Sequence, residues 1–188
     1  MPKLLQPSVM RSSEWYKREN RDAEEWNRIR QQVLKRDNWM CVYCDFRAFK
    51  FMMVNHIGAE DSHELHNLET VCKACHSVLH MGINASSGYL TVIESTANQA
   101  DIVRQTRKLV HLHTAWPSLE QKILEQFLTP RGHICDKNES VAWANKMLAS
   151  IAANEFRGYL PEGLAVVFHE EGPWKQFPEA VHKWGLGG

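Results

Sequence analysis

The sequence predicts an α+β protein, in which a small zinc-stapled unit carries an N-terminal helix and is followed by a mostly helical C-terminal region. Two Cys-x-x-Cys pairs, at residues 41–44 and 72–75, are spaced as metal-binding knuckles. A strand pattern over residues 49–57 lies between them, and the 3.6-residue period of amphipathic helices occupies much of the remainder. We therefore divide the chain into a zinc-binding domain over residues 12–94, which includes the N-terminal helix, and a helical region over residues 95–188.

The composition is that of an ordinary soluble domain. The chain has 188 residues, of which 44% are hydrophobic and 23% charged, and no apolar run approaches the ~18 residues of a membrane span. Its first residues lack the apolar core of a secretory signal, so we expect a cytoplasmic protein with no membrane partner. In that reducing compartment, paired cysteines indicate metal binding rather than disulfide bonds.

The charge distribution limits the classes of partner. The formal net charge is zero, so the whole molecule does not attract a polyanion, and nucleic-acid binding would rest on a local patch. Residues 51–71 hold four acids and no Lys or Arg, which mildly favours a cation there. In the more basic segment before them, Arg36, Arg47 and Lys50 are candidate phosphate contacts, beside the simpler interpretation of a solvated helix face.

The elements of the zinc-binding domain follow from periodicity. Apolar residues recur among charged ones over residues 12–36, which predicts an amphipathic helix with a serine N-cap. After the first knuckle, the strand over residues 49–57 brings Asn55 and His56 to its end. A polar loop follows, and the second knuckle then runs into a short helix over residues 71–81.

The rest of the chain combines one strand with several helices. A Gly/Asn/Ser-rich loop over residues 82–88 precedes a strand over residues 89–93. Ser118 and Gln121 have the spacing of a capping box. The helices that we expect cover residues 99–113, 118–128, 138–153 and, after a less regular segment, 178–184.

The cysteines of the two knuckles form the strongest metal motif. They are Cys41, Cys44, Cys72 and Cys75. Zinc prefers four soft ligands in a tetrahedron, and four thiolates leave no open position for water or substrate, so we expect a structural rather than a catalytic Zn²⁺. The fifth cysteine, Cys135, lies near His133 in the sequence, and we interpret it as a partly buried thiol rather than a ligand or nucleophile.

The residues around the knuckles resemble the HNH, or ββα-metal, endonuclease motif over roughly residues 36–82. The matching features are the first knuckle, a strand ending in Asn55-His56-Ile57, a polar loop, Asn67-Leu68, and Cys72-x-x-Cys75-His76 on a helix, with His80 one turn further along the same face. The resemblance implies metal-dependent hydrolysis of phosphodiester bonds. DNA is favoured over RNA as the substrate only by this family resemblance.

The resemblance also implies a role for each position. His56 would be the general base that activates water, and Asn67 would orient it. Asn55, His76 and His80 would hold a divalent ion. The chemistry needs these groups, because hydrolysis requires a water nucleophile, a cation and a base with a pKa near neutrality. Where the family usually carries Asp or His, this chain has Asn55, whose amide oxygen is a weaker ligand. With two imidazoles in the shell, the ion is left open among Mg²⁺, Mn²⁺, Ni²⁺, Co²⁺ and Zn²⁺.

Over a wider span, about residues 15–113, the chain also resembles the IcmJ (DotN) component of type IVB secretion systems. The shared runs are Val33-Leu-Lys-Arg-Asp37, Cys44-x-Phe46, Met53-Val-Asn55, Asn67-Leu-x-Thr-Val-Cys72 and Tyr89-Leu-Thr-Val-Ile-Glu94. That family is similar in fold to the nucleases but serves as a zinc-stapled subunit of a coupling complex, and its members can lack the histidines. The alternative function is therefore a catalytically inactive adaptor, which would bind a protein partner through the C-terminal helices. The three histidines retained here favour the endonuclease as the first hypothesis.

Overall fold

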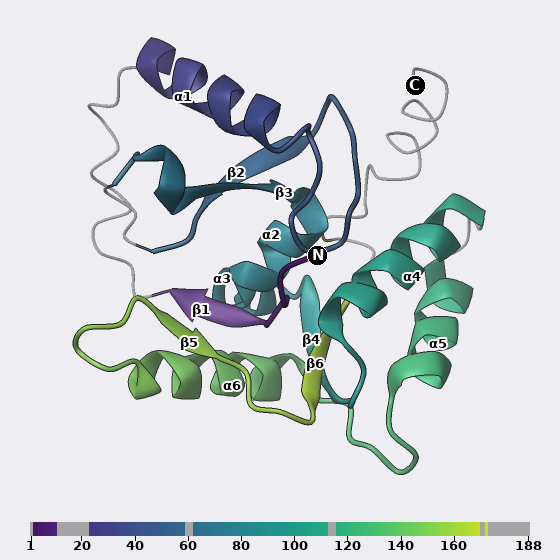
Figure 1. Ribbon diagram of the computed structural model, residues 1–188. Helices are drawn as coiled ribbons and strands as arrows, with labels where there is room; N and C mark the ends of the chain where they lie inside the picture. The colour runs from purple at the N-terminus through teal and green to yellow at the C-terminus, as the bar shows by residue number, and fades with distance from the viewer. Residues whose placement is uncertain (1, 11–22, 59–61, 113–115, 170–171, 173–188) are drawn as a thin grey trace.

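The fold is α+β, as predicted. The computed structural model describes residues 2–10, 23–58, 62–112, 116–169 and 172 (Figure 1). Within these residues there are six α-helices and three two-stranded antiparallel sheets. None of the described helices is long and apolar enough to cross a membrane.

A hairpin between two helices forms the first part of the molecule. Strand β2 (Met52–His56) pairs with β3 (Leu68–Cys72), and helices α1 (Ala23–Arg36) and α2 (Lys73–Leu79) lie on opposite sides of it (Figure 1). The strand predicted over residues 49–57 and the helix predicted over residues 71–81 are confirmed in shorter form. The first residues of the helix predicted over residues 12–36 lie outside the described residues.

Arginine side chains fasten α1 to the hairpin backbone. Arg30 Nη2 donates to the Met52 carbonyl at 2.7 Å, and Arg36 Nη2 donates to the Leu68 carbonyl at 2.8 Å. On the same helix, Val33 and Leu34 are buried. Helix α1 is therefore held by apolar burial along one stripe and by charge-assisted hydrogen bonds beside it.

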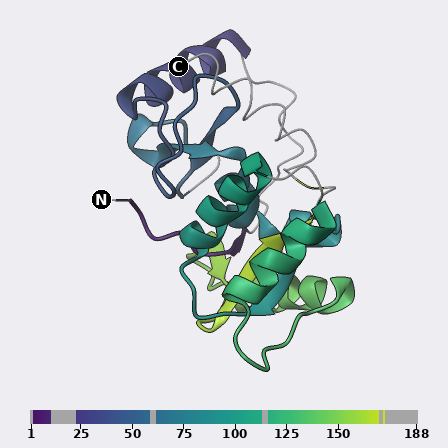
Figure 2. The same cartoon turned by 90° about the vertical axis from the view of Figure 1, so that its right-hand side faces the viewer.

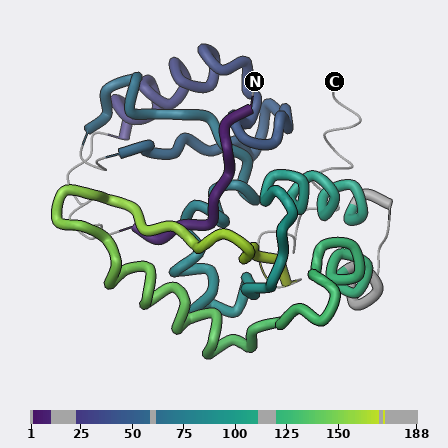
Figure 3. The backbone as a smooth tube through the Cα atoms, turned by 60° about the horizontal axis from the view of Figure 1, so that its bottom comes forward, coloured from purple at the N-terminus to yellow at the C-terminus, as the bar shows by residue number. Residues whose placement is uncertain are grey.

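The two ends of the described chain meet in a second sheet. Strand β1 (Ser8–Met10) pairs with β5 (Arg157–Tyr159), and helix α6 (Lys137–Ser150) lies against them (Figure 3). A Cβ at Gly158 would stand 2.5 Å from the Met147 carbonyl oxygen, so only glycine lets β5 approach α6 this closely.

A third sheet joins segments from either side of residue 95. Strand β4 (Leu90–Glu94) pairs with β6 (Leu164–Phe168), and helices α4 (Gln99–Leu112) and α5 (Trp116–Phe127) lie side by side next to it (Figure 2). The strand predicted over residues 89–93 and the helix predicted over residues 99–113 are confirmed as β4 and α4. One continuous apolar core includes buried side chains of α1, β3, α2, β4 and β6, among them Leu34, Val71, Val78, Val92 and Val166.

Three details differ from the sequence predictions. The segment predicted as a loop after α2 is a short helix, α3 (Met81–Ser86), because Met81 and Ala85 are four residues apart and both are buried. The helix predicted to start at Ser118 already includes Trp116, so Ser118 is not its N-cap. The segment described as less regular contains β5 and β6. The helix predicted over residues 178–184 lies outside the described residues.

Candidate metal centre and the predicted histidine site

The four knuckle cysteines converge on one buried point. Cys41, Cys44, Cys72 and Cys75 are each at most 2% exposed, and their sulfur atoms all lie within 4.8 Å of one another. The Cys44 and Cys72 sulfurs are 3.7 Å apart, close to the ~3.8 Å edge of a zinc tetrathiolate tetrahedron with Zn–S bonds of ~2.3 Å. The cluster thus has the geometry that a structural zinc ion requires.

Local structure places two of these sulfurs with little freedom. Cys72 ends β3 and is the N-cap of α2, where its sulfur accepts a hydrogen bond from the Cys75 amide at 3.4 Å. In the first knuckle, the Cys41 amide donates to the Phe46 carbonyl at 2.8 Å, and the Asp45 amide donates to the Cys41 carbonyl at 3.1 Å. A turn and a strand–helix junction therefore present their thiols to the same ion.

Two arginines of α4 contact the first knuckle and were not singled out in the sequence. Arg107 Nη1 lies 3.4 Å from the Cys44 sulfur, and its guanidinium lies over the Phe46 ring at 4.3 Å. Arg104 donates to the carbonyls of Tyr43 and Cys44. Their three-residue spacing on a helix puts both on one face. Because four thiolates outweigh the charge of one zinc ion, these cations partly neutralise the centre.

Hydrogen bonds from the neighbouring thiols favour the ionised form of Cys44. Those from Cys41 are the largest cause of its lowered pKa, followed by those from Cys72 and Cys75, and Arg107 adds to this effect. A thiolate is the form that binds zinc, so Arg107 supports metal binding by the first knuckle.

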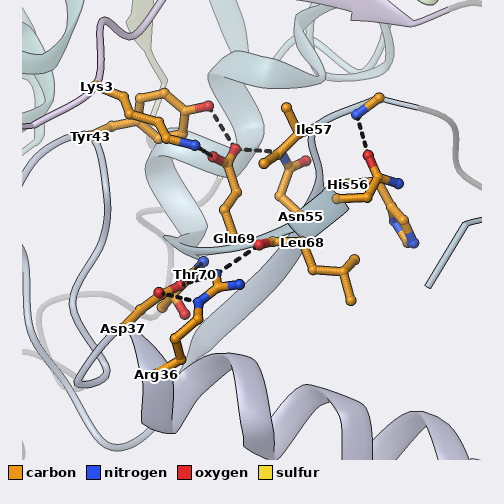
Figure 4. A network of polar contacts seen from close by, with 12 residues as sticks. Lys3, Arg36, Asp37, Tyr43, Asn55, His56, Ile57, Leu68, Glu69 and Thr70 are labelled. Atoms are coloured by element: carbon orange, nitrogen blue, oxygen red, sulfur yellow. Dashed lines mark hydrogen bonds and ion pairs between the residues drawn. The ribbon is translucent and has the colours of Figure 1, made fainter. Parts of the chain in front are cut away.

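Asn55, the predicted weak metal ligand, is buried between two opposite charges. Its Nδ2 donates to Glu69 Oε1 at 2.9 Å, and its Oδ1 accepts from Arg157 Nη2 at 3.4 Å. The Glu69 carboxylate also accepts from the Tyr43 hydroxyl at 2.6 Å and from Lys3 Nζ at 2.8 Å (Figure 4). Burial, followed by the charge of Glu69, raises the pKa of Tyr43, so this phenol remains a proton donor. Both ends of the Asn55 amide are thus engaged.

Arg157 of β5 joins four elements at the end of the hairpin. This side chain is 8% exposed, and each of its five N–H groups has an acceptor. The acceptors are the carbonyls of Ile57 at 3.3 Å, Leu79 at 3.2 Å and His56 at 2.6 Å, Ser8 Oγ at 3.2 Å and Asn55 Oδ1 at 3.4 Å. Nothing in the sequence around Arg157 singles it out, because its acceptors come from β1, β2 and α2 as well as the following loop.

His56, the predicted base, faces the other side of the hairpin. Its ring stacks on Trp26 of α1, with ring centres 5.8 Å apart and an angle of 10° between the planes, and it lies 5.6 Å from the His63 ring. Successive strand residues point to opposite faces, so Asn55 is directed toward Arg157 and α2 while His56 is directed toward α1. His63, in the loop that follows β2, therefore lies beside the predicted base.

The two predicted helix ligands lie at the junction of α2 and α3. The rings of His76 and His80 are 4.4 Å apart. His80 ends α2 with φ −116° and ψ 41°, so it is not on a continuous helical face with His76. Across the described ranges, two groups bring three or more Cys, His, Asp or Glu ligand atoms within 4.8 Å of one another: the four cysteines, and His133 with Cys135 and Glu139. Neither group includes His76 or His80, the two histidines predicted to hold the catalytic ion together with Asn55.

Asn67, the predicted orienting residue, spans the loop between the strands. Its Oδ1 accepts from the Gly58 amide at 2.8 Å, and its Nδ2 donates to the Ser62 carbonyl at 2.8 Å. These bonds fix both ends of the loop. The loop follows His56 directly.

Of the three predicted phosphate contacts, one is engaged in structural hydrogen bonds and two are exposed. Arg36 is held by both oxygens of Asp37, at 2.7 and 2.9 Å, and by backbone carbonyls, so its role is structural. Arg47 and Lys50 are exposed on the first knuckle, beside Phe49. The structure therefore leaves two of the three predicted cations at an accessible surface.

Comparisons with known proteins identify no relative. No protein-family model matches the chain, and no curated protein matches it significantly. The functional argument therefore rests on the geometry of the residues.

Loss of one knuckle thiol is expected to unfold the protein. Zinc binding to such sites contributes on the order of 10 kcal/mol, comparable to the whole stability of ~5–15 kcal/mol of a domain. The Cys72→Ser variant should lose its structural zinc and its cooperative thermal transition, measured by metal analysis and circular dichroism. Cys135→Ser, a cysteine outside the cluster, is the matched control and should retain the cooperative transition and the zinc of the cluster, which a moderate chelator does not remove. A Cys72→Ser protein that lacks this tightly held zinc and still unfolds cooperatively would contradict the assignment.

Removal of the buried Arg157 guanidinium is expected to lower the free energy of unfolding more than removal of an exposed arginine. Arg157→Met leaves five acceptors without their donor, so the free energy of unfolding should fall by about 3–5 kcal/mol. Arg28→Met, in an exposed pair with Glu25, should change it by less than about 0.5 kcal/mol. Urea unfolding with zinc in excess measures both. Equal effects of the two substitutions would show that Arg157 does not tie the hairpin to β5.

Proposed function

We propose that the protein is a zinc-stapled adaptor that binds a protein partner and does not hydrolyse nucleic acid. The observation that carries this proposal is the position of Arg157. Its guanidinium lies between the end of β2 and the end of α2 and binds Asn55 Oδ1. The HNH resemblance implies a divalent ion held by the same Asn55 and by α2.

A fixed positive charge at this point opposes binding of a second cation. At ~4 Å separation, two unit charges repel by about 4 kcal/mol at an effective dielectric constant of ~20, and a divalent ion doubles the repulsion. Glu69 offsets part of this repulsion, but both ends of the Asn55 amide are already engaged, the oxygen by Arg157 and the nitrogen by Glu69. The placement of His56 on the α1 side of the hairpin further separates the proposed base from the α2 histidines.

The surface best suited to a protein partner lies on the first knuckle. We call Trp39, Met40, Arg47, Phe49 and Phe51 the aromatic face. Phe49 is 65% exposed and Phe51 55% exposed. The Trp39 ring meets the Phe49 ring edge-on at 5.4 Å, and the Arg47 guanidinium lies 5.8 Å from the centre of the Phe49 ring. Aromatic residues, Met and Arg are the types enriched where proteins bind one another.

The aromatic face is not where the sequence analysis expected a partner to bind. The adaptor hypothesis placed the partner on the C-terminal helices. Among the described side chains of α4 and α6, Leu148 is the one large apolar residue that is exposed. Exposed aromatic area is concentrated instead beside the zinc cluster, where the metal makes the backbone rigid and binding costs little ordering entropy. The resemblance to a subunit of a secretion coupling complex supports the same class of partner.

Metal-dependent DNA cleavage is the second candidate. It is favoured by the close pairs His76–His80 and His56–His63, because imidazoles bind Mn²⁺, Ni²⁺, Co²⁺ and Zn²⁺ as well as activating water. In this case Arg47 and Lys50 would contact phosphate, and the aromatic face would lie beside the DNA.

Plasmid cleavage separates the two candidates. We expect no nicking of supercoiled DNA by the folded, zinc-loaded protein with Mg²⁺, Mn²⁺, Ni²⁺, Co²⁺ or added Zn²⁺, resolved on agarose gels. The His56→Ala variant should be indistinguishable from the native chain. Nicking by the native chain that disappears in His56→Ala would establish the endonuclease and reject the adaptor.

Photocrosslinking tests the aromatic face directly. A photoreactive phenylalanine placed at Phe49 or Phe51 in the producing cells should yield a discrete crosslinked protein of constant mass. The same group at Ile83, which is 60% exposed on α3, is the matched control and should yield none. Crosslinks only to nucleic acid, or equal crosslinking at all three positions, would count against a protein partner at this face.

A further inference from the structure

Three chemically different metal ligands meet between β4 and the start of α6. His133 Nε2 lies 3.1 Å from both carboxylate oxygens of Glu139. The Cys135 sulfur completes the group, in which all ligand atoms are within 4.8 Å of one another. None of these residues belongs to the knuckles or to the predicted histidine site.

The backbone sets His133 and Cys135 side by side. The segment that carries them runs antiparallel to β4: the Glu94 amide donates to the His133 carbonyl at 3.0 Å, and the Cys135 amide donates to the Val92 carbonyl at 2.9 Å. In an extended chain, residues two apart point to the same side. The histidine and the cysteine therefore share one side of this short ribbon.

Glu139 is brought to them by the capping box of α6. The Asp136 amide donates to Glu139 Oε2 at 2.8 Å, and the Glu139 amide donates to Asp136 Oδ1 at 2.8 Å. These reciprocal bonds fix the carboxylate in the first turn of the helix. Glu139 Oε1 can then serve as a monodentate ligand, so the site is largely organised before any ion binds.

The ligand set and its surroundings suit a zinc-type ion. Imidazole, thiolate and carboxylate are the three protein ligand types of zinc, and three protein ligands leave a fourth position open for water. Cys135 is buried, whereas the His133 and Glu139 side chains are about half exposed, so an ion can enter from solvent. Glu139, Asp136 and Glu94 place negative charge around the Cys135 sulfur, and these carboxylates attract a cation. Binding of the cation displaces the thiol proton.

Another histidine–glutamate ion pair in the chain has no cysteine beside it. His66 Nδ1 lies 3.2 Å from Glu64 Oε2, with both side chains strongly exposed. This pair belongs to no group of three ligands in the described part of the chain. It provides an internal comparison for a histidine–glutamate contact without a thiol.

We propose that His133, Cys135 and Glu139 bind a second divalent zinc-type ion, with water as the fourth ligand. This ion exchanges with solvent and fastens the ribbon beside β4 to α6. It is independent of the tetrathiolate cluster and of the proposed adaptor function.

Metal stoichiometry of the full chain tests this site. After equilibration in a buffer of fixed free zinc, the native protein should hold one equivalent beyond that of the tetrathiolate cluster, and a moderate chelator should remove it without changing the circular dichroism. His133→Ala and Glu139→Gln should each lose this equivalent. Glu139→Gln retains the capping box, because a glutamine oxygen still accepts from the Asp136 amide. The His66→Ala control should retain the extra equivalent.

Cobalt distinguishes the proposed ligands from a nonspecific surface ion. Co²⁺ added to the protein with its structural zinc in place should produce a thiolate charge-transfer absorption that is absent in Cys135→Ser and present in His66→Ala. No extra equivalent in the native protein would overturn the proposal. So would an extra equivalent retained by His133→Ala, or a cobalt spectrum unchanged in Cys135→Ser.

Discussion

The tetrathiolate cluster is the constraint on which the zinc-binding half of the molecule depends. It joins a turn, the end of β3 and the first turn of α2 at one point, and the arginines of α4 contact the first knuckle from outside. A hairpin of two five-residue strands buries too little surface to be stable alone. A zinc ion at this cluster would supply the missing stabilisation locally. The rigid frame then positions the exposed Phe49 and Phe51 side chains and the end of β2.

A second centre, made of opposite buried charges, connects that half to the rest. Glu69 and Arg157 do not bond each other directly; the amide of Asn55 donates to one and accepts from the other. An asparagine is the side chain suited to this position, because an aspartate offers no donor to Glu69 and an aliphatic residue offers neither group. What looked in sequence like a weakened metal ligand is thus well explained as a bridge between a carboxylate and a guanidinium. The contact between Asn55 and Arg157 therefore changes the interpretation of the predicted metal site, from an ion-binding site to a structural one.

The parts that sequence could predict are those encoded over short spans. The four cysteines were identified because knuckle spacing is a local property, and α4 and β4 because their apolar periodicity is strong. Helix α3 was missed because its Gly/Asn/Ser content is typical of a loop, and the burial of Met81 and Ala85 that stabilises it depends on tertiary contacts. The roles of Arg157 and of the His133–Cys135–Glu139 group could not be predicted, since their partners come from separate elements. The resemblances assigned roles to the histidines from their positions along the chain, but they carried no information on which face of the hairpin each one occupies.

The pairing of β1 with β5 imposes an order on assembly during synthesis. Ser8 and Arg157 are in contact although 149 positions separate them. A ribosome releases all four knuckle cysteines long before it releases β5, so the nascent chain can capture zinc while the groups later held by Arg157 are still hydrated. Pairing of β1 with β5 must wait until residues 157–159 have been made, and such long-range contacts form slowly. A zinc ion bound at the cluster would therefore act early in folding, and the Arg157 contacts would form later.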